Sequence, residues 1–215
     1  MKLRELEPEE LRELHATELT EAFPPEELKP FSAMEALCRS GLYHPMGAWE
    51  GETLLGYALL WESPGGKYVL IDYLGVTASR RNRGLGGQIL QALGEKFRDW
   101  DGIIVESEAP DGGAHDGLRN RRMDFYRRSG YTFLDYDCVL FGVHYKVCLC
   151  SPSGRGTEAE AMEAHKALYR RQFARWAYDR FIQIPRDPEN PLRPPESWAE
   201  QETLPGLEER KEEPL

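Results

Sequence analysis

The chain has 215 residues, of which 40% are hydrophobic, and it carries a formal net charge of −10. This length fits one domain with appendages, and the hydrophobic content is sufficient for a core. The acidic balance argues against a nucleic-acid-binding protein, which would show a basic face. No run of eighteen apolar residues occurs and the N-terminus has no apolar signal region, so we expect no membrane contact and a cytoplasmic location.

Four cysteines occur in the chain: Cys38, Cys138, Cys148 and Cys150. Four cysteines do not form a disulfide framework in a chain of this length. Cys148 and Cys150 would point to opposite faces of a strand and could not converge on one metal ion. We therefore expect reduced, structural thiols and no bound metal.

The N-terminal part of the chain predicts two helices. Pro8 suits a first helical turn, and the apolar positions that follow it are Leu11, Leu14 and Leu19. The run Phe23-Pro24-Pro25 ends this helix. Ser32–Glu35 has the pattern of a capping box for a short second helix, which Gly41 stops.

Three strands and a further helix are expected next. Strands at 45–50 and 53–62 are joined by a hairpin turn at Glu50-Gly51-Glu52. The apolar run Tyr68–Leu74 predicts a third strand. Apolar residues spaced by three and four positions between Leu85 and Phe97 predict a helix.

Between this strand and helix lies the stretch Val76–Gly87, with the sequence VTASRRNRGLGG. A glycine-rich turn that leads into a helix attracts anions, because its N–H groups and the helix dipole point at one spot and glycines let a phosphate approach. The stretch lacks the Gly-Lys-Ser/Thr of kinase-type phosphate loops. It also fails the dinucleotide pattern, because Ile89 stands where the third glycine belongs.

Arg81-x-x-Gly84-x-Gly86 resembles the pyrophosphate loop of the GNAT superfamily, the acetyl-CoA-dependent N-acetyltransferases. A second stretch, Asn120–Tyr131, is similar to the later signature of this family, a helix with Phe-Tyr that ends at a glycine and enters a strand. Gly130 occupies the helix end, where a positive φ is needed. The two motifs lie about forty residues apart, which leaves room for one helix, a strand at 102–106 and a loop. Arg122 departs from the family pattern, which has a small residue there.

The resemblance covers roughly Leu3–Val147 and implies an α+β GNAT fold, with a mixed, mostly antiparallel central sheet flanked by helices. We expect a GNAT acetyltransferase domain at 1–150, a C-terminal helical extension at 151–185 and an acidic, proline-rich tail at 186–215.

The predicted extension begins with a capping box at Thr157–Glu160. The apolar residues along one face of the helix that follows are Met162, Tyr169, Phe173, Trp176 and Ala177. This face would pack either on the domain or against the second subunit of a homodimer. The tail carries nine acidic and four basic residues, a composition typical of an extended or disordered segment.

The resemblance also implies the site. The residues expected to bind acetyl-CoA are Leu74, Val76, Arg81, Asn82, Arg83, Gly84, Leu85, Gly86, Gly87 and Asn120. The backbone near Val76 would face the acetyl oxygen, and Tyr126 would be the general acid for the departing thiolate. The alternative for Tyr126 is a core tyrosine whose hydroxyl is satisfied by the backbone. Arginines gather near the two motifs, at positions 80, 81, 83, 119, 121, 122, 127 and 128, and local basicity suits the phosphates of CoA.

The general base stays open between the carboxylates of Asp72, Glu106 and Glu108, and His44 and His144 are further alternatives. Asp72 lies four residues before Val76, so both occupy one face of the strand, and an unpaired carboxylate inside an apolar strand would be costly. Glu106 ends the next predicted strand. The alternative is that one of them caps a loop or pairs with an arginine.

The resemblance implies transfer of an acetyl group from acetyl-CoA to a primary amine, by direct attack in a ternary complex. A small-molecule amine is the favoured acceptor. The alternatives are a protein N-terminus or lysine as acceptor, and a catalytically silent acyl-CoA-binding module.

Overall fold

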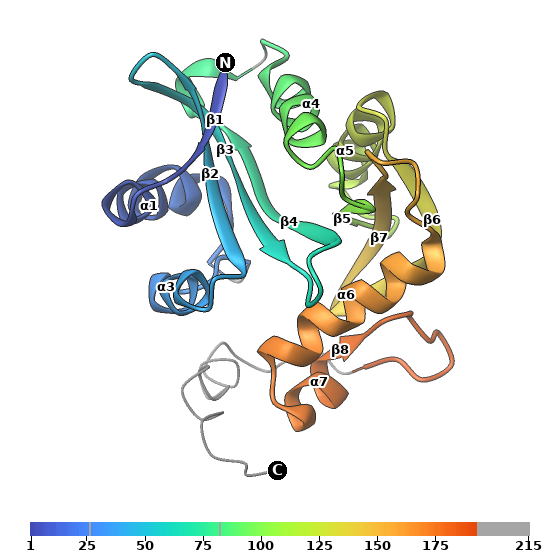
Figure 1. Ribbon diagram of the computed structural model, residues 1–215. Coiled ribbons are helices and arrows are strands. Elements are labelled where there is room, and N and C mark those ends of the chain that lie inside the picture. Colours follow the sequence, from blue (N-terminus) through green and yellow to red (C-terminus); the bar gives the residue numbers. More distant parts are fainter. Residues whose placement is uncertain (26, 82, 193–215) are drawn as a thin grey trace. The chain divides into compact units, whose positions relative to one another are not determined.

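The computed structural model describes residues 1–25, 27–81 and 83–192, which form two compact units. The first unit comprises Met1–Glu62 and Ile71–Lys96. The second comprises Ser63–Leu70 and the described residues from Phe97 onward (Figure 1). Strand β4 (Tyr68–Val76) therefore supplies residues to both units.

The first unit contains strands in the order β1-β2-β3-β4. Besides β4, these are β1 (Lys2–Glu5), β2 (Tyr43–Glu50) and β3 (Thr53–Glu62). The helical segments are α1 (Pro8–Leu14), η1 (His15–Leu19), α2 (Thr20–Ala22), α3 (Phe31–Arg39), η2 (Ala78–Arg80) and α4 (Leu85–Lys96). The pairs β1–β2 and β2–β3 are antiparallel. Figure 1 shows α1 and α3 on one side of these strands and α4 on the other.

The first predicted helix is confirmed, with one local difference. Pro8 stands in the first turn of α1, and Leu11 and Leu14 are buried. The helix continues through a π-helical turn, η1, in which Leu19 is 0% exposed. A π-turn inserts one residue into the helical repeat. Leu19 therefore takes the inward position that residue 18 would hold in an uninterrupted α-helix.

The predicted capping box at Ser32–Glu35 is wrong. Helix α3 begins earlier, at Phe31, and Pro30 occupies its N-cap with φ −54°. Proline fixes this backbone angle, and the Pro30 carbonyl accepts the N–H groups of Ala33 and Met34. The predicted end is confirmed, since Gly41 follows α3 with φ +74°.

The predicted hairpin is confirmed. Glu50 pairs with Thr53 across the turn, and Gly51 adopts φ +59°, a left-handed conformation that glycine tolerates. Strand β2 begins at Tyr43, two residues before the predicted start. Pro45 thus lies inside β2 rather than opening it.

The second unit contains strands in the order β5-β7-β6-β8. Its elements are β5 (Gly102–Glu108), α5 (Asp116–Arg128), β6 (Thr132–Leu140), β7 (Val143–Cys150), α6 (Glu158–Gln172), α7 (Arg175–Phe181) and β8 (Ile182–Gln183). The pairs β5–β7, β6–β7 and β6–β8 are antiparallel. Helix α5 packs against β5 and β6, and α6 packs against β5 and α7. The predicted α+β class is confirmed.

The C-terminal extension differs from the single helix that the sequence predicts. The Thr157 side chain accepts the Glu160 N–H, as expected of a cap. Phe173 is extended, however, with φ −105° and ψ 141°, so α6 ends there and α7 begins two residues later. The predicted apolar face is therefore broken, and Trp176 is 49% exposed.

Most of the predicted tail, residues 193–215, lies outside the described residues. Its described beginning is attached to the second unit, because the Arg186 N–H donates to the Asp137 carbonyl oxygen. The division at 150 and 185 stays a prediction. Within the described part of the chain, no helix combines the length and the apolar character needed to cross a membrane.

Candidate functional site

The predicted phosphate-binding loop lies in the first unit, between β4 and α4. Thr77 attaches the end of β4 to β3, since both its N–H and its hydroxyl donate to the Leu55 carbonyl oxygen, at 3.0 and 3.2 Å. The Ala78 N–H donates to the Glu18 carboxylate at 3.0 Å. The start of the loop is thus held by β3 and by η1 before the chain reaches the helix.

The entry into α4 has the backbone that an anion site needs. Gly84 adopts φ +72°, which side-chain-bearing residues rarely tolerate. A Cβ at Gly84 or Gly87 would meet no atom within 4 Å, so the backbone here is open to an approaching group. The first N–H groups of any α-helix lack intrahelical partners and carry its positive dipole end. Arg81 and Arg83 are exposed beside them, and Asn82 lies outside the described residues.

Close packing holds α4 and the end of β4 on β3. A Cβ at Gly56 would lie 2.5 Å from the Gly75 carbonyl oxygen and 2.7 Å from Ile89 of α4. Only glycine at position 56 permits this approach. Leu74 and Val76, both half-buried, lie on either side of Gly75 in β4. The loop is therefore positioned by a rigid base.

Asp72 of β4 is a paired carboxylate. It accepts hydrogen bonds from Lys29 Nζ and from the Tyr43 hydroxyl, each at 2.6 Å, and its side chain is 9% exposed. The neighbouring Tyr73 hydroxyl donates to the Glu27 carbonyl oxygen. Asp72 and Tyr73 therefore bind the segment that precedes α3, which explains how an apolar strand accommodates a carboxylate.

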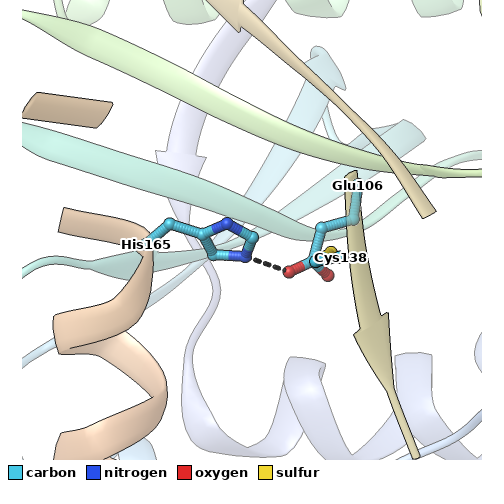
Figure 2. A group of neighbouring side chains, drawn as sticks. All are labelled: Glu106, Cys138 and His165. Carbon is cyan, nitrogen blue, oxygen red and sulfur yellow. Dashed lines mark hydrogen bonds and ion pairs between the residues drawn. The ribbon is translucent and has the colours of Figure 1, made fainter. Parts of the chain in front are cut away.

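Glu106 of β5 has different partners, all within the second unit. Its carboxylate contacts His165 Nε2 at 2.6 Å (Figure 2) and accepts the Tyr169 hydroxyl at 2.8 Å. The second ring nitrogen of His165 contacts the Tyr136 hydroxyl at 3.2 Å. His165 is 0% exposed. Strand β5 continues two residues beyond Glu106, so Glu106 does not end the strand as predicted.

Sequence reasoning missed Lys29 and His165. The signal for His165 was its spacing, because the buried residues of α6 are Ala161, His165, Leu168 and Tyr169. A polar residue on the inward face of a helix needs a partner. No comparable pattern in the sequence predicts a role for Lys29, which lies in a loop.

Tyr126 of α5 is buried in the second unit, with 6% exposure. Its ring contacts Phe125 and Tyr131. Among the described residues of its own unit, no backbone or side-chain group hydrogen-bonds its hydroxyl, and the choice between a general acid and a core tyrosine stays a prediction. Burial raises the pKa of Tyr126, which keeps the phenol protonated.

The arginines near the second motif divide into two groups. Arg119 is bound by the carboxylates of Glu108, Asp111 and Asp116, at 2.8, 2.6 and 3.3 Å. These bonds raise the pKa of Arg119 and occupy its guanidinium. The other arginines of the motif, Arg121, Arg122, Arg127 and Arg128, are exposed, as is Asn120. Arg119 therefore has a structural role at the start of α5.

Comparison with known proteins identifies the class. Residues 8–131 match the model of the Acetyltransferase (GNAT) family, which is more than half of the chain. The chain therefore belongs to the GNAT family. It is 33% identical over 115 residues to YjbC of Bacillus subtilis (strain 168), whose name assigns it to the acetyltransferases; the match covers 53% of this chain and spans about half of YjbC, 54%.

Solved structures share the fold. A GNAT-family protein from Bacteroides thetaiotaomicron has a TM-score of 0.63 at 21% identity, covering 77% of this chain and 95% of that one. The Vibrio cholerae spermidine N-acetyltransferase, solved with CoA and spermine, has a TM-score of 0.54 at 12% identity, covering 71% and 95%. The ribosomal-protein-S18-alanine N-acetyltransferase of Escherichia coli has a TM-score of 0.55 at 12% identity, covering 73% and 97%. The shared fold thus accompanies acceptors of different kinds.

Proposed function

We propose that the protein transfers an acetyl group from acetyl-CoA to the amine of a small molecule. Membership of the GNAT family supports the reaction class. The observation that carries the proposal is the entry into α4, where Gly84 has φ +72° and the backbone is open at Gly84 and Gly87. In this proposal the pyrophosphate of CoA lies against these N–H groups, and Arg81 and Arg83 contribute positive charge.

The remaining cofactor contacts follow from the family resemblance. Leu74 and Val76 of β4 would pair their backbone with the pantetheine arm, and a backbone N–H near Val76 would polarise the thioester carbonyl. Asn82, Leu85 and Gly86 complete the loop, and Asn120 contributes from α5. The hydrogen bonds of Thr77 and Ala78 support this role, because they hold the chain directly after Val76 in place, and a donor held in place needs no rearrangement when charge develops.

Tyr126 is proposed as the general acid. Collapse of the tetrahedral intermediate releases the CoA thiolate, which takes the phenolic proton. The match of Tyr126 to the tyrosine of the family's Phe-Tyr motif supports this role, and two features are compatible with it: the hydroxyl has no hydrogen-bond partner among the described residues of its unit, and burial raises the pKa of Tyr126 and keeps it protonated. The resulting phenolate regains a proton from solvent before the next turnover.

Attack is proposed to be direct, without an acetyl-enzyme. Burial raises the pKa of all four thiols, those of Cys38, Cys138, Cys148 and Cys150. Thiolate is the reactive form of cysteine, so these side chains are poor nucleophiles at neutral pH. The amine therefore attacks the thioester within a ternary complex, where proximity supplies roughly 7–11 kcal/mol.

Proton removal from the amine is assigned to a carboxylate, with Asp72 as the first candidate and Glu106 as the second. Lys29 and Tyr43 hold Asp72 in one orientation. A carboxylate held in place can accept a proton directly or through a water molecule.

The acceptor is proposed to be a cationic small amine. The spermidine N-acetyltransferase with the same fold supports this choice, and a net charge of −10 attracts cationic ligands. The S18-alanine enzyme supports the alternative of a protein N-terminus.

The test is release of CoA thiol from acetyl-CoA with a panel that includes spermidine, an aminoglycoside, free amino acids and an alanine-starting peptide. We expect turnover with at least one small amine and a rate that depends on both substrates without a ping-pong pattern. Turnover with the peptide alone would contradict a small-molecule acceptor and would favour a protein N-terminus as the acceptor. No turnover with any amine, or a trapped acetyl-enzyme, would contradict it.

A further inference from the structure

A cluster of three potential metal ligands lies in the second unit, away from the α4 loop in sequence. Glu106 comes from β5, Cys138 from β6 and His165 from α6, and Figure 2 shows Glu106 and His165 pointing toward one another, with the Cys138 sulfur partly hidden by the Glu106 carboxylate. One ligand atom from each lies within 4.8 Å of the others. Cys138 and His165 are both 0% exposed. Two strands and a helix therefore place an oxygen, a sulfur and a nitrogen ligand atom close together.

Two tyrosine hydroxyl groups hydrogen-bond to the residues of the cluster. The Tyr136 hydroxyl contacts His165 Nδ1 at 3.2 Å, which leaves Nε2 directed at Glu106. The Tyr169 hydroxyl donates to Glu106. Residues that bind metals in proteins have their second polar atom held in this manner, which fixes the orientation of the ligand. The tyrosines therefore orient both the imidazole and the carboxylate.

The environment of Cys138 is a second observation that favours a metal site. No hydrogen-bond partner for its Sγ occurs among the described residues of its unit, although Glu106 and His165 are close. A structural cysteine in an apolar core needs no such neighbours. A thiol beside a carboxylate and an imidazole is, in contrast, a ligand set typical of zinc and related divalent transition metals.

We propose that Glu106, Cys138 and His165 bind a divalent transition-metal ion of the zinc class. Binding replaces the Cys138 thiol proton by the metal and moves the proton of His165 from Nε2 to Nδ1, where the Tyr136 oxygen accepts it. One proton is released to solvent. The dipositive ion is then balanced by one thiolate and one carboxylate, so the buried site is neutral.

The bound metal would join α6 to the strands β5 and β6. Three protein ligands leave a fourth position for water. Glu106 is then a ligand and is not available as a base, so this inference assigns proton removal to Asp72. The proposal does not depend on acetyl transfer, because metal binding can be measured without acetyl-CoA.

The test uses the full chain, freed of metal by chelation and then titrated with Co²⁺ alone. We expect one equivalent to bind, with the thiolate-to-cobalt charge-transfer absorption of a cysteine-ligated site, and Zn²⁺ to displace it. Cys138→Ser should abolish this absorption and weaken Co²⁺ binding at least about tenfold. Because a bound ligand stabilises the folded state, Zn²⁺ should also raise the Tm of the wild type.

Cys148→Ser is the matched control, since Cys148 is likewise 0% exposed in the same unit and lies on β7. It should retain the absorption. Glu106→Gln provides a second variant if Cys138→Ser does not fold, and it should weaken Co²⁺ binding while keeping a side chain of the same shape. Absence of the absorption in the wild type, or its persistence in a folded Cys138→Ser or Glu106→Gln protein at unchanged affinity, would overturn the proposal.

Discussion

Asp72 and Glu106 look alike in the sequence, because each is a carboxylate within a mostly apolar strand, yet their surroundings differ. Asp72 is paired with the cationic Lys29 and with the Tyr43 hydroxyl. Glu106 is surrounded by His165, Tyr169 and, close by, the Cys138 thiol. The first arrangement is an ion pair that attaches a loop to the strand. The second consists of groups that can exchange a proton for a metal. The identity of the partners, and not the position in the strand, therefore distinguishes the proposed base, Asp72, from the proposed metal ligand, Glu106.

The largest effect is expected for a residue that should be needed whichever carboxylate acts as the base. Tyr126→Phe keeps the ring but removes the proton for the thiolate, so kcat should fall by about 10²–10⁴, with little change in KM for acetyl-CoA. Steady-state kinetics measure this. Tyr131→Phe is the control, because its hydroxyl is buried and without a partner among the described residues. A fully active Tyr126→Phe enzyme would remove the assignment.

Asp72→Asn tests whether the ion-paired carboxylate is the base. The variant should lower kcat at neutral pH by about 10²-fold, the lower limit for general-base catalysis. The loss should shrink as the pH rises, because more of the amine is then already unprotonated. The pH profile of kcat measures this, with Glu106→Gln as the comparison. An equal loss at every pH would assign Asp72 a structural role only.

The same substitution should reduce stability, because the partly buried ion pair between Lys29 and Asp72 is lost. We expect the free energy of unfolding to fall by about 1–3 kcal/mol in Asp72→Asn, measured by urea denaturation. Lys29→Met and the double variant complete a double-mutant cycle, and the loss in the double variant should be smaller than the sum of the two single losses, because both substitutions remove the same ion pair. Purely additive losses in the double variant would show that the pair contributes no coupling energy.

A smaller effect is expected at Arg4–Glu10, an ion pair that is more open to solvent. The Arg4 guanidinium lowers the pKa of Glu10 to about 2. A carboxylate with a lowered folded-state pKa stabilises the protein above its ordinary pKa, and this stabilisation is lost as the pH falls toward 2. Glu10→Gln should therefore cost about 0.5 kcal/mol at pH 7, given solvent screening, and nothing near pH 2. Denaturation at several pH values measures the difference, and a cost that persists in acid would contradict the ion-pair explanation.

Local sequence rules predicted most elements, because their signals lie within a few residues. The hairpin at Gly51 and the helix end at Gly130 both require a positive φ, and both glycines have one. The errors have local causes as well. Pro30 displaced the predicted cap of α3, and the extended Phe173 split the predicted C-terminal helix.

The environments of the predicted site residues could not be foreseen in the same way. Lys29 and Asp72 are 43 positions apart, and Glu106 and His165 are 59 apart. Such contacts depend on strand register and on where α6 packs, which local periodicity does not determine. The loop before α4 was easier to predict, since its strand, glycines and helix are consecutive.

The most direct test of the account is the affinity for CoA when a negative charge is placed at the start of α4. Gly87→Glu and Gly94→Glu introduce the same side chain into one helix, at positions where a Cβ meets no atom within 4 Å. Isothermal titration calorimetry should show about 10²-fold weaker CoA binding for folded Gly87→Glu, because like charges in contact cost several kcal/mol, and unchanged binding for Gly94→Glu. Wild-type affinity in a folded Gly87→Glu protein would contradict the proposed location of the cofactor.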